Sequence, residues 1–145
     1  VVTAAGSPSR VVVAGHSAGA HLVAMVALAA APPVAVDRVV LVSGVFDLRP
    51  VQMMSVNDAL GWTAGQATAL SPALRPTAAG GSSRVGAVTM LWGGRDTAAF
   101  GRQSRAYAAQ LRDAGLAVTE DERPERHHFD ILDDLPVLVA DPAVP

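Results

Sequence analysis

The chain of 145 residues contains no cysteine, and all eleven of its basic residues are arginine. The missing cysteine excludes a disulfide framework and a thiolate metal site. The missing lysine excludes a lysine nucleophile and a Schiff base. Any covalent chemistry in this chain must therefore use another nucleophile.

The sequence also lacks a hydrophobic run long enough to span a membrane. Its longest apolar stretch, residues 22–31, stops at Pro32-Pro33, far short of the roughly 20 residues that a spanning helix needs. The formal charge is only −2, with acidic and basic residues interspersed, so no charged surface indicates nucleic acid or an anionic membrane as a partner. We predict a small-molecule substrate, no nucleic-acid partner and no membrane partner, and we leave a homodimer open.

Half of the residues are hydrophobic, which is enough for one buried core in a chain of this length. Apolar runs bounded by turn signals predict four strands covered on both faces, and helical patterns lie between them. We expect strands at about residues 10–14, 37–44, 86–91 and 116–122, and helices at about 18–31, 100–114 and from 129 to just before Pro136. This alternation predicts an α/β fold with a parallel sheet and flanking helices, joined by right-handed crossovers in a single domain.

The segment between the second and third predicted strands, residues 45–81, is expected to be irregular. Short helical pieces are expected near residues 51–54 and 57–60, and prolines and glycines break the rest. A segment of this kind is suited to form a cap or the wall of a pocket.

The most informative segment is Gly-His-Ser-Ala-Gly at residues 15–19, between the first strand and the first helix. In that setting it is typical of a nucleophile elbow. A tight turn would hold Ser17 in a strained backbone conformation, with Gly15 and Gly19 leaving room for it. The helix that follows would direct its free N–H groups at a reacting carbonyl, with Ala18 as one oxyanion donor. We predict Ser17 as a covalent nucleophile.

Two histidines lie beside this serine. His16 is the variable residue of the pentapeptide, and His21 lies one helical turn after Ser17. We interpret both as packing or hydrogen-bonding residues rather than catalytic ones. A chance match in a chain rich in glycine, alanine and serine is the alternative explanation of the pentapeptide, and the strand before it and the helix after it favour the elbow.

Partners for the serine are expected where loops converge at the carboxyl ends of parallel strands. Asp96 follows the third predicted strand, and His127 and His128 follow the fourth. Asp47, after the second strand, competes with Asp96 as the acid, and Asp96 could simply begin the next helix. The chain order serine, acid, histidine favours Asp96. Only one of the adjacent histidines can point at Ser17, and without a third spaced ligand the pair does not form a zinc site.

Six short segments carry a more specific pattern. They are residues 15–22 (Gly-His-Ser-Ala-Gly-Ala-His-Leu), 43–50 (Ser-Gly-Val-Phe-Asp-Leu-Arg-Pro), 56–58 (Val-Asn-Asp), 70–72 (Leu-Ser-Pro), 96–105 (Asp-Thr, then Phe100 and Arg-Gln-Ser-Arg) and 128–131 (His-Phe-Asp-Ile). Through them the chain resembles the kynurenine formamidases (arylformamidases) of the α/β-hydrolase fold along nearly its whole length. The resemblance implies Ser17 as nucleophile, Asp96 as acid and His128, rather than His127, as base. We also predict no cofactor and no metal site.

Two features depart from that family. Ala98 and Ala99 precede Phe100 where the family usually has Pro-Glu-Phe, which is expected to alter the rim of the pocket. The family's His-Gly-Gly segment, which supplies the rest of the oxyanion hole upstream of the elbow, does not occur in residues 1–145. We therefore expect a partial α/β-hydrolase domain over residues 1–145, the carboxyl-terminal half of the fold, whose elbow strand has an unpaired edge.

The predicted function is that of a serine hydrolase with a Ser-His-Asp triad that converts N-formylkynurenine to kynurenine and formate. The alternatives are a carboxylesterase or deacetylase of the same fold, and a catalytically inactive truncated hydrolase or binding protein. We assign the protein to the cytoplasm.

Overall fold

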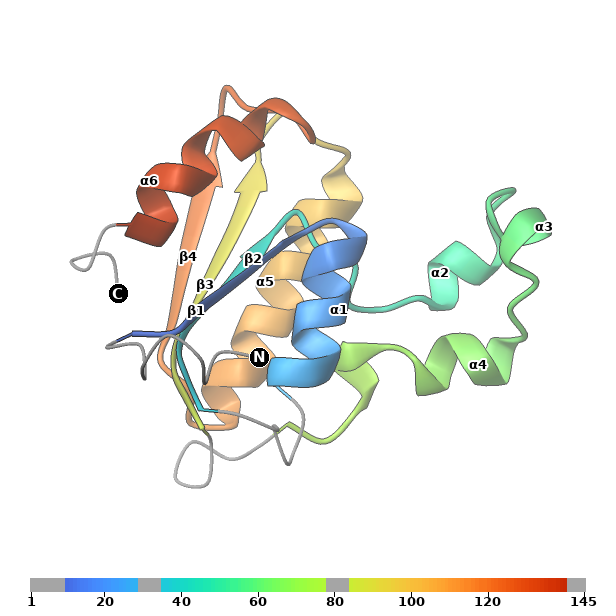
Figure 1. Ribbon diagram of the computed structural model, residues 1–145. Helices are drawn as coiled ribbons and strands as arrows, with labels where there is room; N and C mark the ends of the chain where they lie inside the picture. The colour runs from blue at the N-terminus through green and yellow to red at the C-terminus, as the bar shows by residue number, and fades with distance from the viewer. Residues whose placement is uncertain (1–9, 29–34, 78–83, 141–145) are drawn as a thin grey trace, which may run out of the picture.

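The computed structural model describes residues 10–28, 35–77 and 84–140 (Figure 1). Four parallel strands form one sheet in these residues, in the order β1-β2-β3-β4. The strands are β1 (Val12–His16), β2 (Val36–Val42), β3 (Val85–Gly93) and β4 (Val118–Arg123). The helices are α1 (Ala18–Ala27), α2 (Arg49–Gln52), α3 (Asn57–Leu60), α4 (Ala64–Ala69), α5 (Ala98–Asp113) and α6 (Leu135–Ala140), with short 3-10 turns η2 (Pro72–Leu74) and η3 (Asp130–Asp134). The predicted α/β fold with a parallel sheet is confirmed.

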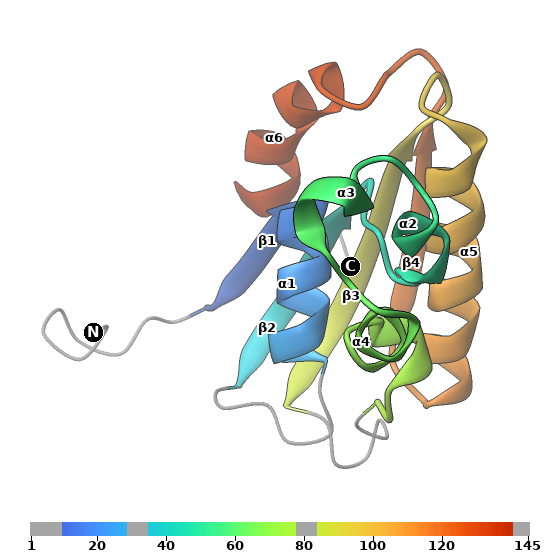
Figure 2. The same ribbon diagram turned by 90° about the vertical axis from the view of Figure 1, so that its right-hand side faces the viewer.

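Helices cover both faces of the sheet (Figures 1 and 2). Side chains of a strand alternate between the faces, so β2 and β3 contribute to two separate cores. On the face covered by α1 and α5, the core includes Val39, Leu41, Val88, Met90, Ala20, Ala24, Tyr107 and Leu111. On the face covered by η3 and α6, it includes Val40, Val42, Leu91, Ile131 and Leu138. Burial on both sides explains why β2 and β3 are nearly continuous apolar runs rather than alternating ones.

Each predicted strand is present, with its ends shifted by a few residues. Helix α5 ends close to its predicted end, and Gly115 follows it with a φ of 85°, a left-handed conformation that glycine adopts without strain. The first helix is described only as far as Ala27, with Leu28 as its C-cap; the rest of its predicted span, residues 29–31, lies outside the described residues. None of the helices in the described ranges has both the length and the apolar character needed to cross a membrane.

The segment after β2 contains a helix that the sequence pattern does not predict. The N-cap of α4 is Thr63, whose side chain accepts the N–H of Gln66, while the Gln66 side chain accepts the N–H of Thr63. This reciprocal capping box starts the helix although the segment has no helical apolar period. The α2–α4 segment extends beyond α1 on the α1/α5 side of the sheet (Figure 1).

The prediction that the last helix begins near Phe129 and ends before Pro136 is wrong. A 3-10 turn occupies Asp130–Asp134, and α6 then runs through Leu135–Ala140 with Pro136 as its second residue. Proline fits there because the N–H groups of the first helical turn have no intrahelical acceptor to lose.

A single residue, Ser17, joins β1 to α1, with φ 54° and ψ −117°. Its N–H donates a 2.8 Å hydrogen bond to the carbonyl of Val42 at the end of β2. A Cβ added to Gly15 would lie 2.3 Å from the carbonyl oxygen of Gly19, so only glycine fits at position 15. A Cβ added to Gly19 would meet nothing within 4 Å. The expectation that both glycines leave room for the turn is therefore correct for Gly15 and wrong for Gly19.

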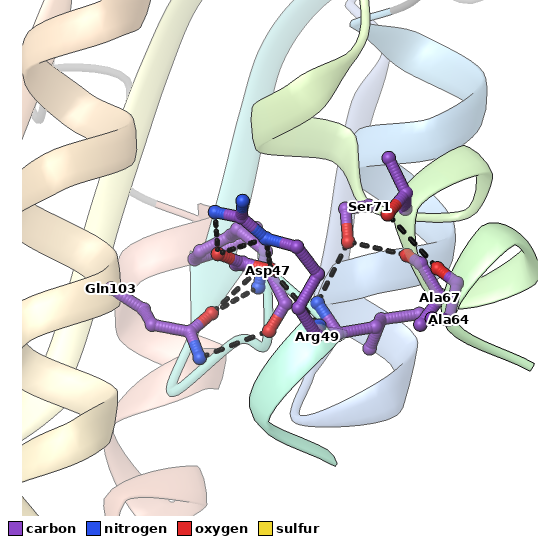
Figure 3. Close-up of polar contacts among 9 residues, drawn as sticks. Asp47, Arg49, Ala64, Ala67, Ser71 and Gln103 are labelled. Carbon is purple, nitrogen blue, oxygen red and sulfur yellow. Dashed lines mark hydrogen bonds and ion pairs between the residues drawn. The ribbon is translucent and has the colours of Figure 1, made fainter. Parts of the chain in front are cut away.

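The loop that leaves β2 is held by a side chain from α5 (Figure 3). The Oε1 atom of Gln103 accepts the N–H groups of Phe46 (2.7 Å) and Asp47 (2.8 Å). Its Nε2 atom donates to the carbonyl of Asp47 at 3.2 Å. One amide therefore satisfies three backbone groups that have no strand partner, which fixes the path of the loop.

A second side chain ties the same loop to α4 (Figure 3). The buried hydroxyl of Ser71 accepts the N–H of Leu48 at 2.7 Å and donates to the carbonyl of Ala67 at 2.7 Å. The loop after β2 is thus fixed on one side by α5 and on the other by the end of α4.

We expect Gly15→Ala to destabilise the protein by about 1–3 kcal/mol, because the new methyl group must displace the backbone of α1. Gly19→Ala, the matched control, should leave stability unchanged or raise it by up to about 1 kcal/mol, since alanine favours a helix and the space is open. Urea unfolding of the full-length protein measures both changes. Equal destabilisation by the two variants would contradict the packing described for the turn.

We expect Gln103→Leu to cost about 2 kcal/mol of unfolding free energy, because it leaves three backbone groups of the loop without their partner. Gln110 lies about two turns further along α5 and is also half-buried. The same substitution there, Gln110→Leu, should change stability by less than about 0.5 kcal/mol. Unfolding curves for the two variants would refute the role of Gln103 if their midpoints coincided.

Candidate active site

Three polar side chains meet at the carboxyl ends of the parallel strands, where loops from distant parts of the chain converge. Ser17 follows β1, Asp96 follows β3 and His128 follows β4. The Nε2 atom of His128 lies 3.1 Å from the Oγ of Ser17, and its Nδ1 atom lies 3.1 Å from Oδ2 of Asp96. The structure thus brings Ser17 together with Asp96, which the chain order favours as the acid, and with His128, which the family resemblance favours over His127.

The competing residues contact other partners. The carboxylate of Asp47 binds the guanidinium of Arg49, with a shortest distance of 2.7 Å (Figure 3). That hydrogen bond lowers the pKa of Asp47. The ring of His127 is half exposed and contacts Asp130, with Nε2 3.3 Å from Oδ2. Asp47 and His127 therefore contact other side chains, whereas Asp96 contacts His128, and His128 contacts Ser17.

The carboxylate of Asp96 is almost completely buried. Its side chain is 3% exposed, against 20% for His128. One oxygen faces His128, and the other accepts the N–H of Thr97, the N-cap of α5, at 3.2 Å. The alternative interpretation of Asp96 is a residue that only begins the next helix, and it does contact the start of α5. Its other oxygen binds the imidazole of His128. A buried carboxylate interacts with a neighbouring imidazole more strongly than an exposed one, because little water screens the contact.

Contacts on both sides fix the loop that carries His128. The carbonyl of Arg126 accepts the N–H of Arg95, in the loop after β3, at 3.0 Å. The guanidinium of Arg126 binds the carboxylate of Asp134 in η3 at 2.6 Å. The loop is therefore attached both to the loop that holds the acid and to the turn that follows the histidine.

Three rings surround the imidazole of His128. Phe100, at the start of α5, has its ring centroid 4.4 Å away, and Phe129 makes an edge contact at 5.1 Å. His16, the last residue of β1, lies 4.6 Å away. Its Nε2 atom is 2.6 Å from the carbonyl oxygen of His128. His16 is therefore a packing and hydrogen-bonding residue, as the sequence indicates, but its partner could not be identified from the chain order.

The first turn of α1 lies beside the serine. The N–H of Ala18 belongs to the first residue of the helix, so it has no acceptor within the helix. The positive end of the helix dipole favours negative charge at this position. His21, one turn further on, forms a 2.7 Å hydrogen bond with the carbonyl of Leu70, which connects α1 to the end of α4.

A pocket of about 420 Å³ opens beside the serine. Its walls come from α1, the loop after β2 and the α2–α3 segment, in keeping with the predicted pocket wall. Apolar side chains dominate the lining, which consists of Ser17, Ala18, His21, Val45, Leu48, Val51, Leu60 and Trp62. Within residues 10–28, 35–77 and 84–140, no group of three or more histidine, aspartate or glutamate side chains could hold a metal ion. The pocket thus suits an apolar or aromatic group that reaches the hydroxyl at one end.

Comparison with known sequences gives a family and a set of relatives. Residues 2–131 match the family described as the alpha/beta hydrolase fold. A kynurenine formamidase from Danio rerio is 35% identical over 125 residues, which cover 83% of this chain and 43% of that protein. A kynurenine formamidase from Salmo salar is also 35% identical, over 127 residues. The chain spans less than half the length of these curated relatives. The predicted resemblance to the kynurenine formamidases is confirmed.

Solved structures show the same fold. A candidate thioesterase from a Silicibacter species is 32% identical with a TM-score of 0.69, over 92% of this chain and 50% of that one. A carboxylesterase from Lactobacillus plantarum superimposes over 98% of this chain and 54% of that one with a TM-score of 0.62, and at 17% identity it shows the fold alone. Because the family match extends over most of a chain with this sheet and this elbow turn, we conclude that the chain belongs to the alpha/beta hydrolase fold family.

Proposed function

We propose that the protein is a serine hydrolase that cleaves an aryl formamide, converting N-formylkynurenine to kynurenine and formate. The observation that supports this most strongly is the pair of 3.1 Å contacts that link Ser17, His128 and Asp96. In the proposal Ser17 is the nucleophile, His128 the base and Asp96 the acid. The similarity to kynurenine formamidases of two fish supports the substrate.

In the first step His128 accepts the hydroxyl proton of Ser17 at Nε2 while Oγ forms a bond to the formyl carbon. This requires a neutral imidazole with its remaining proton on Nδ1. The Asp96 carboxylate, 3.1 Å from Nδ1, favours that tautomer and stabilises the imidazolium that forms. The negative charge that develops on the carbonyl oxygen is stabilised by the N–H of Ala18 and the positive end of α1.

In the second step the bond between the formyl carbon and nitrogen breaks, and His128 gives its proton to the departing arylamine. Water then attacks the formyl-serine with His128 again as base. The proton that His128 took from water passes to Oγ of Ser17 as formic acid leaves, and the formic acid ionises to formate in solution. Each cycle therefore consumes one water and leaves the enzyme unchanged.

The pocket beside Ser17 agrees with this substrate class. A formyl group is small enough to lie at the hydroxyl, while the aryl part of the substrate occupies the apolar space lined by Leu48, Leu60 and Trp62. An arylamine leaves more readily than an alkylamine because its lone pair is delocalised into the ring. The proposal includes a small-molecule substrate, no cofactor and a cytoplasmic location.

We expect Ser17→Ala to abolish labelling by a fluorophosphonate, and Asp96→Asn to slow labelling by up to about 10⁴-fold, because an amide at Nδ1 favours the wrong tautomer. Asp47→Asn, the matched control, should stay within about twofold of the unchanged protein, since Asp47 pairs with a surface arginine. The measurement is the labelling rate of the full-length protein. Labelling that does not depend on Ser17 would favour a binding protein, and a large loss in Asp47→Asn alone would assign the acid to Asp47.

We expect the full-length protein to turn over N-formylkynurenine with a higher kcat/KM than p-nitrophenyl acetate or butyrate, because the proposed site holds a formyl group at Ser17, which is smaller than an acetyl or butyryl group. Kynurenine release is followed by absorbance, with Ser17→Ala as the blank. Turnover of the esters without detectable kynurenine would replace the formamidase assignment with that of a carboxylesterase or deacetylase.

A further inference from the structure

His16 connects the strand that precedes the nucleophile with the loop that carries the proposed base. It is the last residue of β1, and side chains of a strand alternate between faces. Val12 and Ala14 pack into the core beneath η3 and α6, so His16 points to the same face. The loop of His128 passes over that face just before η3 begins. The strand period therefore places an imidazole directly beside this loop.

The contact fixes which nitrogen of His16 carries a proton. Its Nε2 atom lies 2.6 Å from the carbonyl oxygen of His128, and a carbonyl can only accept a hydrogen bond. Nε2 must therefore donate. The bond joins two residues that are 112 positions apart in the chain. Its acceptor is the backbone of His128, and the side chain of the same residue contacts Ser17.

Burial supports a neutral state for this donor. The partly buried site lowers the pKa of His16, chiefly because an imidazolium would lose hydration there. The nearby His128 acts in the same direction, while the hydrogen bond to its carbonyl and the Asp96 carboxylate act in the opposite one. A neutral His16 can donate without placing a second positive charge 4.6 Å from the ring that becomes cationic in the proposed reaction.

We propose that His16 is a positioning residue: its Nε2–H holds the backbone of His128 so that the imidazole of His128 spans the distance from Asp96 to Ser17. This inference rests on the proposed function of the triad and adds a fourth residue to it. His16 itself does not touch the substrate. It acts by orienting the imidazole of His128. Proton transfer depends on this orientation, because a displacement of a catalytic group by about 1 Å can lower the rate on the order of 10²-fold.

Two substitutions separate the hydrogen bond from ring packing. His16→Phe keeps a ring beside His128 but removes the donor, whereas His16→Gln removes the ring and keeps an N–H at a similar reach. We expect His16→Phe to lower the fluorophosphonate labelling rate and kcat by about 10- to 100-fold, with KM within about threefold because the pocket lining does not include His16. His16→Gln should recover most of the rate. These measurements use the full-length protein, with thermal unfolding as the check that each variant folds.

The outcomes distinguish this inference from the proposed function. If the unchanged protein labels at Ser17 and His16→Phe labels equally fast, the positioning role is refuted and the triad stands. If the loss in His16→Phe persists in His16→Gln, an N–H at this position does not restore the rate, so the loss of the hydrogen bond does not explain the effect, and the inference is again refuted. If the unchanged protein shows no labelling that depends on Ser17, the proposed function fails, and the positioning role fails with it.

A measurement on the unchanged protein does not depend on whether the variants fold. The 15N chemical shifts of the histidine ring distinguish the two neutral tautomers. We expect His16 to be the Nε2–H tautomer at neutral pH. An Nδ1–H tautomer would overturn the proposal, because its Nε2 could not donate to the carbonyl of His128.

Discussion

The close approach of Gly15 to the carbonyl of Gly19 is the contact on which the site depends. Only a hydrogen atom fits between the end of β1 and the first turn of α1, and glycine at this position allows the chain to reverse within one residue. Ser17 therefore takes a positive φ, a cost that the hydrogen bond from its N–H to Val42 helps to offset. The same reversal exposes the hydroxyl and places the free N–H of Ala18 beside it. One steric constraint thus determines the position of the proposed nucleophile and its electrostatic surroundings.

The parallel sheet extends this local constraint to the other two groups. Pairing of His16 with Val42, and of Gly93 with Arg123, aligns the carboxyl ends of neighbouring strands. The loops after β1, β3 and β4 therefore begin at one edge, and short loops are enough to bring Ser17, Asp96 and His128 into contact. A shift in the register of one strand would move its loop by more than the tolerance of a hydrogen bond.

Much of this arrangement could be predicted from the sequence, because strong local signals determine it. Buried apolar runs mark the four strands, and the glycine-serine-glycine turn marks Ser17. The capping box that begins α4 is present in the sequence as Thr63 and Gln66. Prolines and glycines surround it, and they favour an irregular segment over a helix. The bonds from Gln103 to the loop after β2 and from His16 to the carbonyl of His128 join distant residues to backbone atoms. Nearly every residue has the same backbone carbonyl and N–H groups, so no pattern of side chains could reveal these contacts.

Burial of the Asp96 carboxylate links stability to the proposed chemistry. Removing a carboxylate from water costs free energy unless charged or hydrogen-bonding partners replace the water. Here the N–H of Thr97 and the imidazole of His128 take that place. A neutral imidazole compensates only part of this cost. When His128 becomes cationic in the proposed reaction, the same poorly screened contact stabilises the new charge more than water would. A hydrogen bond that contributes little to the stability of the resting protein can therefore contribute most in the transition state of the proposed reaction.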